Sequence, residues 1–154
     1  MTGLSSGGRI LDTCRQPLLE LSYKVQGGDF ASGGEAATRM KRALKQIGID
    51  PDITRRAAIV AYEAEMNIII HAVAGNLMLR VTPDQIEIIA RDEGPGIRDI
   101  NLAMQEGYST ASEQIREMGF GAGMGLPNMK KFSDELLIES EVGKGTEVIA
   151  RIHY

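Results

Sequence analysis

Three short stretches of the chain carry residue types that could hold a nucleotide. Glu63, Asn67 and His71 recur at intervals of four, residues 92–96 read DEGPG, and residues 119–125 have a glycine at every second position. These stretches supply carboxylates, an amide, an imidazole and backbone N–H groups on flexible turns. Such groups suit a purine base, a metal ion and phosphates, provided that the fold brings the three stretches together.

The spacing of four places Glu63, Asn67 and His71 on one stripe of a helix. The surrounding residues are apolar on nearly every side, which predicts a mostly buried helix over residues 51–73. The amide oxygen of Asn67 suits Mg²⁺, and Glu63 could accept a proton from an attacking hydroxyl group or water. An internal hydrogen-bond network or a solvent-facing stripe is the alternative. Glu65 lies off the stripe and is expected to be a solvated charge.

Asp92 follows a strand-like run that begins at residue 85. A carboxylate at the end of a strand can accept a hydrogen bond from an exocyclic amine such as N6 of adenine. Gly94 and Gly96 would let the backbone approach a planar ring, although Asp, Gly and Pro are also ordinary turn residues. Thr146 could point back into the same cleft, but a threonine at such a place is also a common strand former.

The third stretch is a glycine-rich loop that runs into a helix. Alternate glycines deny it a stable helix or strand, and the helix that follows offers free N–H groups and a dipole that attract phosphate. No Gly-Lys-Ser/Thr follows, so it is not a Walker A loop, and no strand leads directly into it, so it is not a Rossmann turn. A flexible linker is the alternative. The predicted nucleotide-binding positions here are Gly119, Gly121, Gly123, Met124, Gly125 and Leu126.

The elements that must position these residues follow from hydrophobic periodicity and turn signals. Residues 1–16 are expected to be a flexible N-terminal tail, and residues 17–154 one domain. Ser32 and Glu35 have the spacing of a capping box, and Asp50 and Pro51 that of a helix start. The order predicts an α+β two-layer sandwich, with a mixed, mainly antiparallel sheet and helices on one face. The expected strands are 18–25, 77–81, 85–91, 136–140 and 147–152; the expected helices are 32–48, 51–73, 100–104 and 124–132, with a long loop over 107–123.

Composition narrows the functional classes. The formal net charge of −4 argues against nucleic acid as the main partner. No stretch approaches the roughly 18 apolar residues of a membrane helix, and no apolar N-terminal core suggests secretion. Cys14 is the only cysteine, so no internal disulfide can form, which fits a reducing cytoplasm. We therefore expect a cytoplasmic protein that binds neither nucleic acid nor membrane.

In this order and at these separations, the motifs resemble those of the GHKL (Bergerat) ATP-binding domain. Glu63-x-x-x-Asn67 matches its N box and Asp92-x-Gly94-x-Gly96 its first glycine box. Residues 119–125 match the second glycine box, at the end of the ATP lid, and Gly145-Thr146 the last short motif. The resemblance covers residues 17–154 and implies the Bergerat fold. It also implies ATP and Mg²⁺ as cofactors, with Asn67 as the metal ligand.

Within that family the chain is most similar to small stand-alone serine/threonine kinases of bacterial partner switching. The similarity lies in residues 103–110 and 123–131 and includes anti-sigma regulatory factors and the switch kinase of the stressosome. It implies phosphorylation of a serine or threonine on a small STAS-type antagonist, with Glu63 as the catalytic residue. A sigma factor or other regulator, and a homodimer, stay open as further partners. Residues 111–118 make the lid longer than we expect for the stressosome kinase.

Two other functions stay open at this point. An ATP-binding module could sequester a sigma factor or another regulator with little or no phosphoryl transfer. An ATPase or a histidine-kinase fragment ranks last, because we expect no room for a second domain carrying a phosphorylated histidine or a transducer lysine.

Overall fold

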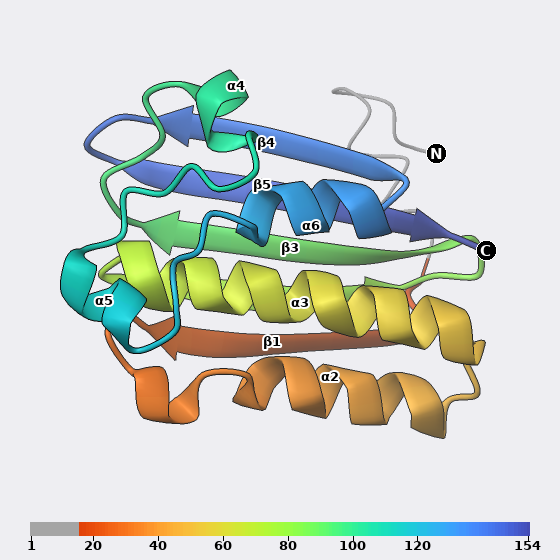
Figure 1. The fold of residues 1–154 in the computed structure, drawn as a ribbon. Helices are drawn as coiled ribbons and strands as arrows, with labels where there is room; N and C mark the ends of the chain where they lie inside the picture. The colour runs from red at the N-terminus through yellow and green to blue at the C-terminus, as the bar shows by residue number, and fades with distance from the viewer. Residues whose placement is uncertain (1–15) are drawn as a thin grey trace.

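A five-stranded sheet forms one layer of the structure. The computed structural model describes residues 16–154, and its strands are β1 (Leu19–Gln26), β2 (Ala74–Val81), β3 (Gln85–Glu93), β4 (Glu135–Glu141) and β5 (Gly145–His153). They lie in the order β1-β2-β3-β5-β4, and every neighbouring pair is antiparallel (Figure 1). The predicted α+β sandwich with a mainly antiparallel sheet is confirmed. The expected tail, residues 1–16, lies outside the described residues apart from Gln16, so the boundary at residue 17 stays a prediction.

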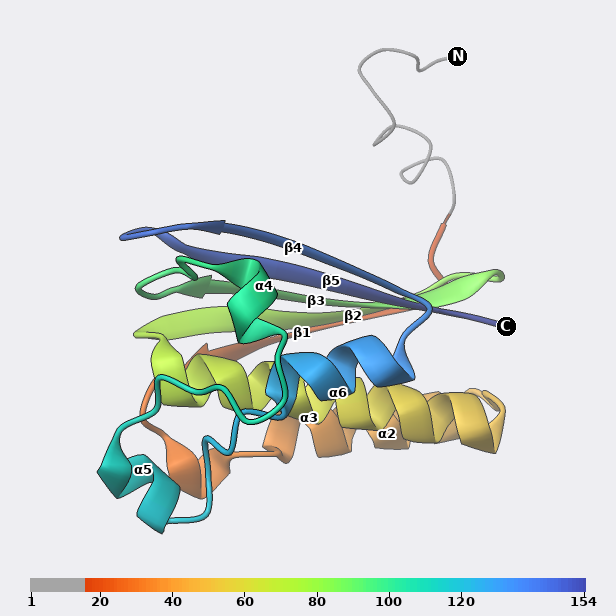
Figure 2. The same cartoon turned by 45° about the horizontal axis from the view of Figure 1, so that its top comes forward.

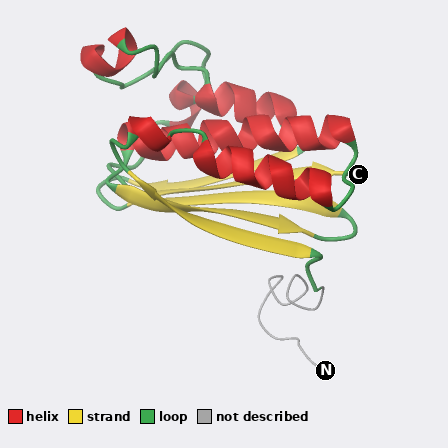
Figure 3. Cartoon of the chain, turned by 90° about the horizontal axis from the view of Figure 1, so that it is seen from below, coloured by secondary structure: helices red, strands yellow, loops and turns green. Residues whose placement is uncertain are grey.

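Three helices cover one face of this sheet: α2 (Glu35–Gln46), α3 (Pro51–His71) and α6 (Gly125–Phe132) (Figures 2 and 3). The long α3 packs against α2 on one side and α6 on the other. The core lies between this helix layer and the inward-facing side chains of the strands. No helix in the described part of the chain is long and apolar enough to cross a bilayer. The fully buried side chains include Met40, Leu44, Val60, Ile68, Leu77, Leu79, Ile86, Met129 and Ile152.

The start of α3 follows from its local sequence. The side chain of Asp50 accepts hydrogen bonds from the N–H groups of Asp52 (3.0 Å) and Ile53 (3.2 Å), and Pro51 stands at the first helical position. Both features match the prediction, because a cap and an N1 proline act within one turn. The helix ends at His71, two residues before the expected end. It therefore carries Glu63 and Asn67 in its C-terminal half.

The start of α2 differs from the prediction. The residue before the helix is Gly34, with φ of 91°, and no local side chain caps it, so the capping box of Ser32 and Glu35 is wrong. Instead, the carboxylate of Glu65 accepts hydrogen bonds from the N–H groups of Ala36 (3.2 Å) and Ala37 (3.0 Å). Glu65 is buried, so its assignment as a solvated charge was also wrong. A buried carboxylate is stable here because it meets the free N–H groups and positive dipole end of a helix.

Three shorter elements complete the described fold: η1 (Phe30–Ser32), α4 (Ile100–Ala103) and α5 (Glu113–Glu117). The short helix predicted over residues 100–104 corresponds to α4. The stretch over residues 107–123, expected to be a loop throughout, contains α5. Ser112 begins α5 by accepting a hydrogen bond from the N–H group of Ile115 (3.3 Å). A five-residue helix is too short to show a periodic pattern in the sequence.

Candidate nucleotide site

Asp92 lies near the end of β3, next to the start of β5. One of its carboxylate oxygens, Oδ1, accepts a hydrogen bond from the backbone N–H of Thr146 (3.2 Å). Burial raises the pKa of the Asp92 carboxyl above its ordinary value, and the Thr146 hydrogen bond opposes that rise. The second oxygen, Oδ2, makes no hydrogen bond within residues 16–154. The contact leaves a half-buried carboxylate with a free acceptor.

Ser140 contacts Thr146, the residue that donates to Asp92, and was missed in the sequence. Its hydroxyl oxygen lies 2.8 Å from the hydroxyl oxygen of Thr146 and accepts a hydrogen bond from the N–H of Ile97 (2.7 Å). Thr146 therefore uses its N–H on Asp92 and its hydroxyl on Ser140. No local motif could have revealed this, because Ser140 lies on β4 and contacts a loop 43 residues earlier.

Gly94 and Gly96 hold the loop after β3 in place. A side chain at Gly94 would begin 3.1 Å from the α-carbon of Ala72, so this loop lies against the C-cap residue of α3. Gly96 has φ of 78°, and a side chain there would collide with the carbonyl oxygen of Glu141. Only glycine fits both the conformation and the space.

Asn67 meets the start of α6 across the helix layer. A side chain at Gly125, the first residue of α6, would begin 3.0 Å from the amide oxygen of Asn67. The side chain of Asn67 makes no hydrogen bond to any residue in the described part of the chain. One turn earlier on α3, Glu63 Oε2 accepts a hydrogen bond from Asn128 Nδ2 of α6 (2.9 Å). His71, the last residue of the same stripe, is exposed at the end of α3.

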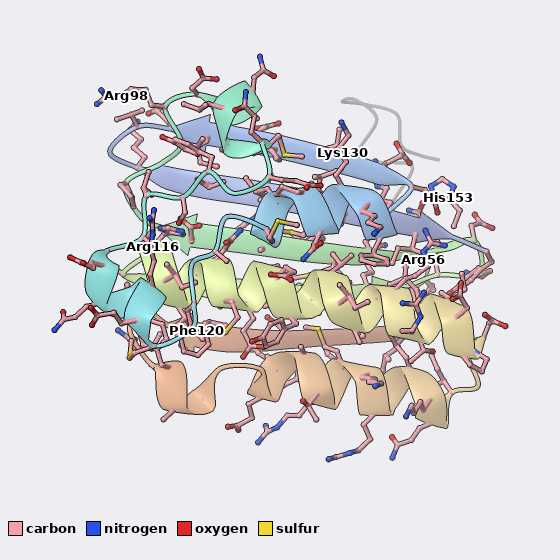
Figure 4. The ribbon with its side chains drawn as sticks, in the orientation of Figure 1. Arg56, Arg98, Arg116, Phe120, Lys130 and His153 are labelled. Atoms are coloured by element: carbon pink, nitrogen blue, oxygen red, sulfur yellow. The ribbon has the colours of Figure 1, made fainter. Side chains whose placement is uncertain are left out.

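Residues 107–123, the predicted lid, connect α4 to α6 and contain α5. The N–H of Gly107 donates to the carbonyl oxygen of Gly123 (2.9 Å), which closes the lid at its base. Arg116 Nη2 donates to the carbonyl oxygen of Ser109 (2.7 Å) inside the lid. The far end contacts the body through Phe120, whose ring centroid lies 5.1 Å from that of Phe30 in η1 (Figure 4).

The predicted glycine-loop positions fall at the lid's C-terminal end. Gly119, Gly121 and Gly123 all have positive φ and form the turns between α5 and α6. Met124 is the N-cap residue of α6 and is partly exposed. Leu126 is buried in the core, so it can offer a ligand only its backbone N–H. This segment includes Gly125, which lies against the side chain of Asn67.

The structure brings Asp92, the predicted adenine-binding residue, and Asn67, the predicted metal ligand, to the same end of the sandwich. Ile68, next to Asn67 on α3, packs on Gly75 of β2, and Gly75 pairs with Asp92 of β3. Asp92 and the first turn of α6 thus both lie beside the C-terminal half of α3, which carries Asn67. Two surface hollows lie elsewhere, along α2. One is lined by Lys24, Asp29 and Arg39, the other by Gly34, Arg42 and Tyr62, and neither includes Asn67 or Asp92.

Comparison with known families and proteins gives a consistent result. Residues 52–154 match the family model described as histidine kinase-, DNA gyrase B-, and HSP90-like ATPase. The chain is 32% identical over 114 residues to the serine/threonine-protein kinase RsbT of Bacillus subtilis, which covers 71% of this chain and 80% of that protein. It is 39% identical over 124 residues to an anti-sigma F factor of Caldanaerobacter subterraneus, covering 76% and 83%.

A solved structure supports the fold alone. The structure of the SiaB–SiaC complex from Pseudomonas aeruginosa contains a chain that superposes with a TM-score of 0.63. The match covers 94% of each chain at 16% sequence identity. Similarity at this level shows that the two chains share an architecture.

Proposed function

The chain belongs to the histidine kinase-, DNA gyrase B-, and HSP90-like ATPase family, and from that premise we propose that it is an ATP-dependent serine/threonine protein kinase. Its substrate is a small STAS-type antagonist of a bacterial partner-switching pathway. The similarity to a named serine/threonine kinase and to anti-sigma F factors supports this class. The observation that carries the proposal is that the C-terminal half of α3 contacts both the start of α6, through Asn67, and the strand pair that carries Asp92, through Ile68.

Asp92 is the adenine-reading residue in this proposal. A nucleotide needs an acceptor for its exocyclic amine, and Asp92 keeps one oxygen free while Thr146 holds the other. Gly94 and Gly96 lie beside the adenine ring in this proposal. Because they carry no side chains, the loop after β3 can approach the ring closely. The site therefore prefers adenine to guanine, whose six-position carries an acceptor instead of a donor.

The phosphates lie at the other end of the site. Free N–H groups of residues 121–126, at the N-terminal end of α6, meet the triphosphate, whereas those of Gly119 and Phe120 already donate to carbonyl oxygens of α5. The uncommitted amide oxygen of Asn67 faces the same region and fits Mg²⁺, which prefers oxygen ligands and shares its coordination with substrate phosphates and water. Residues 16–154 contain no group of three carboxylate, histidine or cysteine side chains that could hold a metal ion. The ion would therefore need the phosphate oxygens as additional ligands. When bound, Mg²⁺ would supply charge neutralisation for the triphosphate.

Glu63 is the catalytic residue in this proposal. It lies one turn from Asn67 on α3, so a serine hydroxyl placed between them could reach the γ-phosphate and lose its proton to Glu63. Phosphoryl transfer depends mainly on positioning and charge neutralisation, and these residues can supply both.

The test is a transfer assay with labelled ATP and a purified STAS-domain protein from the same organism. The proposal expects labelled serine or threonine on that protein, and loss of transfer by roughly 10²–10⁴-fold in Glu63→Gln, with most of the ATP affinity kept. Full transfer by Glu63→Gln would remove Glu63 from the role.

A sequestering module is the second candidate, favoured by the similarity to proteins named anti-sigma F factor. The same assay separates the two. A stable, unlabelled complex with the partner would support the module and contradict the kinase.

A further inference from the structure

Asn128 contacts the proposed catalytic residue from the facing helix. Its Nδ2 donates to Glu63 Oε2 at 2.9 Å, although the two residues lie 65 positions apart in the chain. Both side chains are partly buried, and neither makes another side-chain hydrogen bond within residues 16–154. The amide thus fixes one carboxylate oxygen and leaves the other, Oε1, free.

The helix that carries Asn128 is firmly anchored. Leu126 and Met129, on either side of it, are buried in the core with exposed fractions of 8% and 0%. At the end of α6, Arg56 Nε of α3 donates to the carbonyl oxygen of Phe132 (3.1 Å). Because α6 is held against α3 along its length, the position of the Asn128 amide is set by the core rather than by Glu63.

The two helices also match in register. On α3, Glu63 and Asn67 lie one turn apart, and on α6, Asn128 and Gly125 lie about one turn apart in the opposite direction. Glu63 meets Asn128, while Asn67 lies against Gly125. One rigid helix pair therefore places both the carboxylate and the start of the phosphate-binding helix.

We propose that Asn128 is a positioning residue that holds the Glu63 carboxylate with Oε1 directed to the acceptor hydroxyl; this inference rests on the proposed kinase function. An amide suits this task because it donates a hydrogen bond without bringing a positive charge. A lysine or arginine in its place would stabilise the ionised carboxylate and weaken it as a proton acceptor. Asn128 acts only through Glu63 and touches no reacting atom.

The test is a double-mutant cycle of Glu63→Gln and Asn128→Ala in the transfer assay with ATP and the STAS-domain protein. Loss of one positioning hydrogen bond should lower kcat roughly 3–10-fold while leaving ATP affinity within about twofold. In the Glu63→Gln background, Asn128→Ala should cause no further loss, because the group that it positions is already gone. Lys130→Ala, an exposed position on the same helix, is the matched control and should keep wild-type kcat.

A second variant tests the contact between Asn128 and Glu63 by introducing a negative charge. Asn128→Asp places a carboxylate beside Glu63, so the pH–rate profile should move to higher pH, which a purely structural defect would not produce. The inference is overturned if Asn128→Ala lowers transfer equally in both backgrounds, or leaves kcat unchanged while Glu63→Gln abolishes transfer. Full transfer by Glu63→Gln would instead overturn the proposed role of Glu63, and absence of any transfer by the wild type would overturn the kinase function itself.

Discussion

The two ends of the candidate site are built differently. At the base end, Asp92, Ser140 and Thr146 come from three neighbouring strands and are joined by hydrogen bonds. At the phosphate end, residues 107–123 form a lid joined mostly to itself, through the Gly107–Gly123 bond and the Arg116–Ser109 bond. Its aromatic contact with the body is the pair of Phe120 and Phe30.

We propose that the strands at the Asp92 end recognise the nucleotide, whereas the lid closes over it. A carboxylate held by sheet hydrogen bonds keeps its geometry before the ligand arrives, which lowers the cost of ordering on binding. A lid with few contacts to the core can open locally without unfolding the domain. We therefore expect changes at the base end to alter affinity and stability, and changes in the lid to alter the rates of nucleotide entry and exit.

The largest expected effect on ATP affinity is at Asp92. Asp92→Asn keeps the shape but removes the charged acceptor, and a hydrogen bond to a charged group is worth about 1.5–3 kcal/mol. ATP affinity, measured by calorimetric titration, should fall roughly 10–100-fold. Asp99→Asn, a change of the same type at the exposed start of α4, is the control and should bind ATP normally. Equal ATP affinity in both variants would remove Asp92 from the adenine site.

Two glycines with similar backbone angles give the sharpest contrast in stability. Gly96 (φ 78°) and Gly119 (φ 91°) would both strain an alanine by about 1–3 kcal/mol, but only at Gly96 would the new methyl group collide with backbone. Gly96→Ala should lower Tm clearly in thermal unfolding. Gly119→Ala should leave Tm nearly unchanged, because its strain is released when the lid opens locally. Equal losses would show that the lid unfolds together with the sheet.

The aromatic contact of the lid predicts a kinetic effect. Phe120→Ala removes a pair worth about 0.5–1.5 kcal/mol, so nucleotide dissociation in stopped flow should accelerate roughly 2–10-fold without a change in Tm. Met118→Ala removes an exposed apolar side chain from the same lid and is the matched control. If both variants release nucleotide at the wild-type rate, the ring contact does not hold the lid.

The smallest expected effect is a pH dependence at the base end. Burial raises the pKa of Asp92 in the folded chain, so the folded state keeps this proton to higher pH than the unfolded state does. As pH rises from the ordinary aspartate pKa through the raised one, Asp92 should lower the free energy of unfolding. Over the same window ATP affinity should rise, because the ionised carboxylate accepts from the adenine amine more strongly than the protonated group does.

Comparison with Asp92→Asn isolates this effect, since all other carboxylates and the nucleotide titrate equally in both proteins. Between the ordinary aspartate pKa and the raised pKa of Asp92, the wild type and Asp92→Asn should differ by an amount that changes with pH. This holds for the free energy of unfolding and for the ATP affinity. A constant difference would show that Asp92 does not titrate there.

The sequence could predict those features of the fold and the site that depend on residues close together in the chain. Asp50 and Pro51 identified the start of α3 because a helix cap acts within one turn, and the stripe of Glu63 and Asn67 follows from helical periodicity. Glu65 was misassigned because the N–H groups that it caps lie 28 and 29 residues away. Ser140 and Asn128 carry no local signal for the same reason. Such contacts depend on how strands and helices pack, which periodicity does not encode.

In the proposed complex, α3, β3 and the start of α6 hold one nucleotide between them. The most direct measurement is titration of Mg²⁺–ATP into the ¹⁵N-labelled protein, followed by backbone amide shifts. We expect the shifts to concentrate at Asn67, Asp92, Gly96, Gly125 and Thr146. Shifts confined to the hollows along α2, around Lys24, Arg39 and Arg42, with the other five amides unmoved, would contradict it.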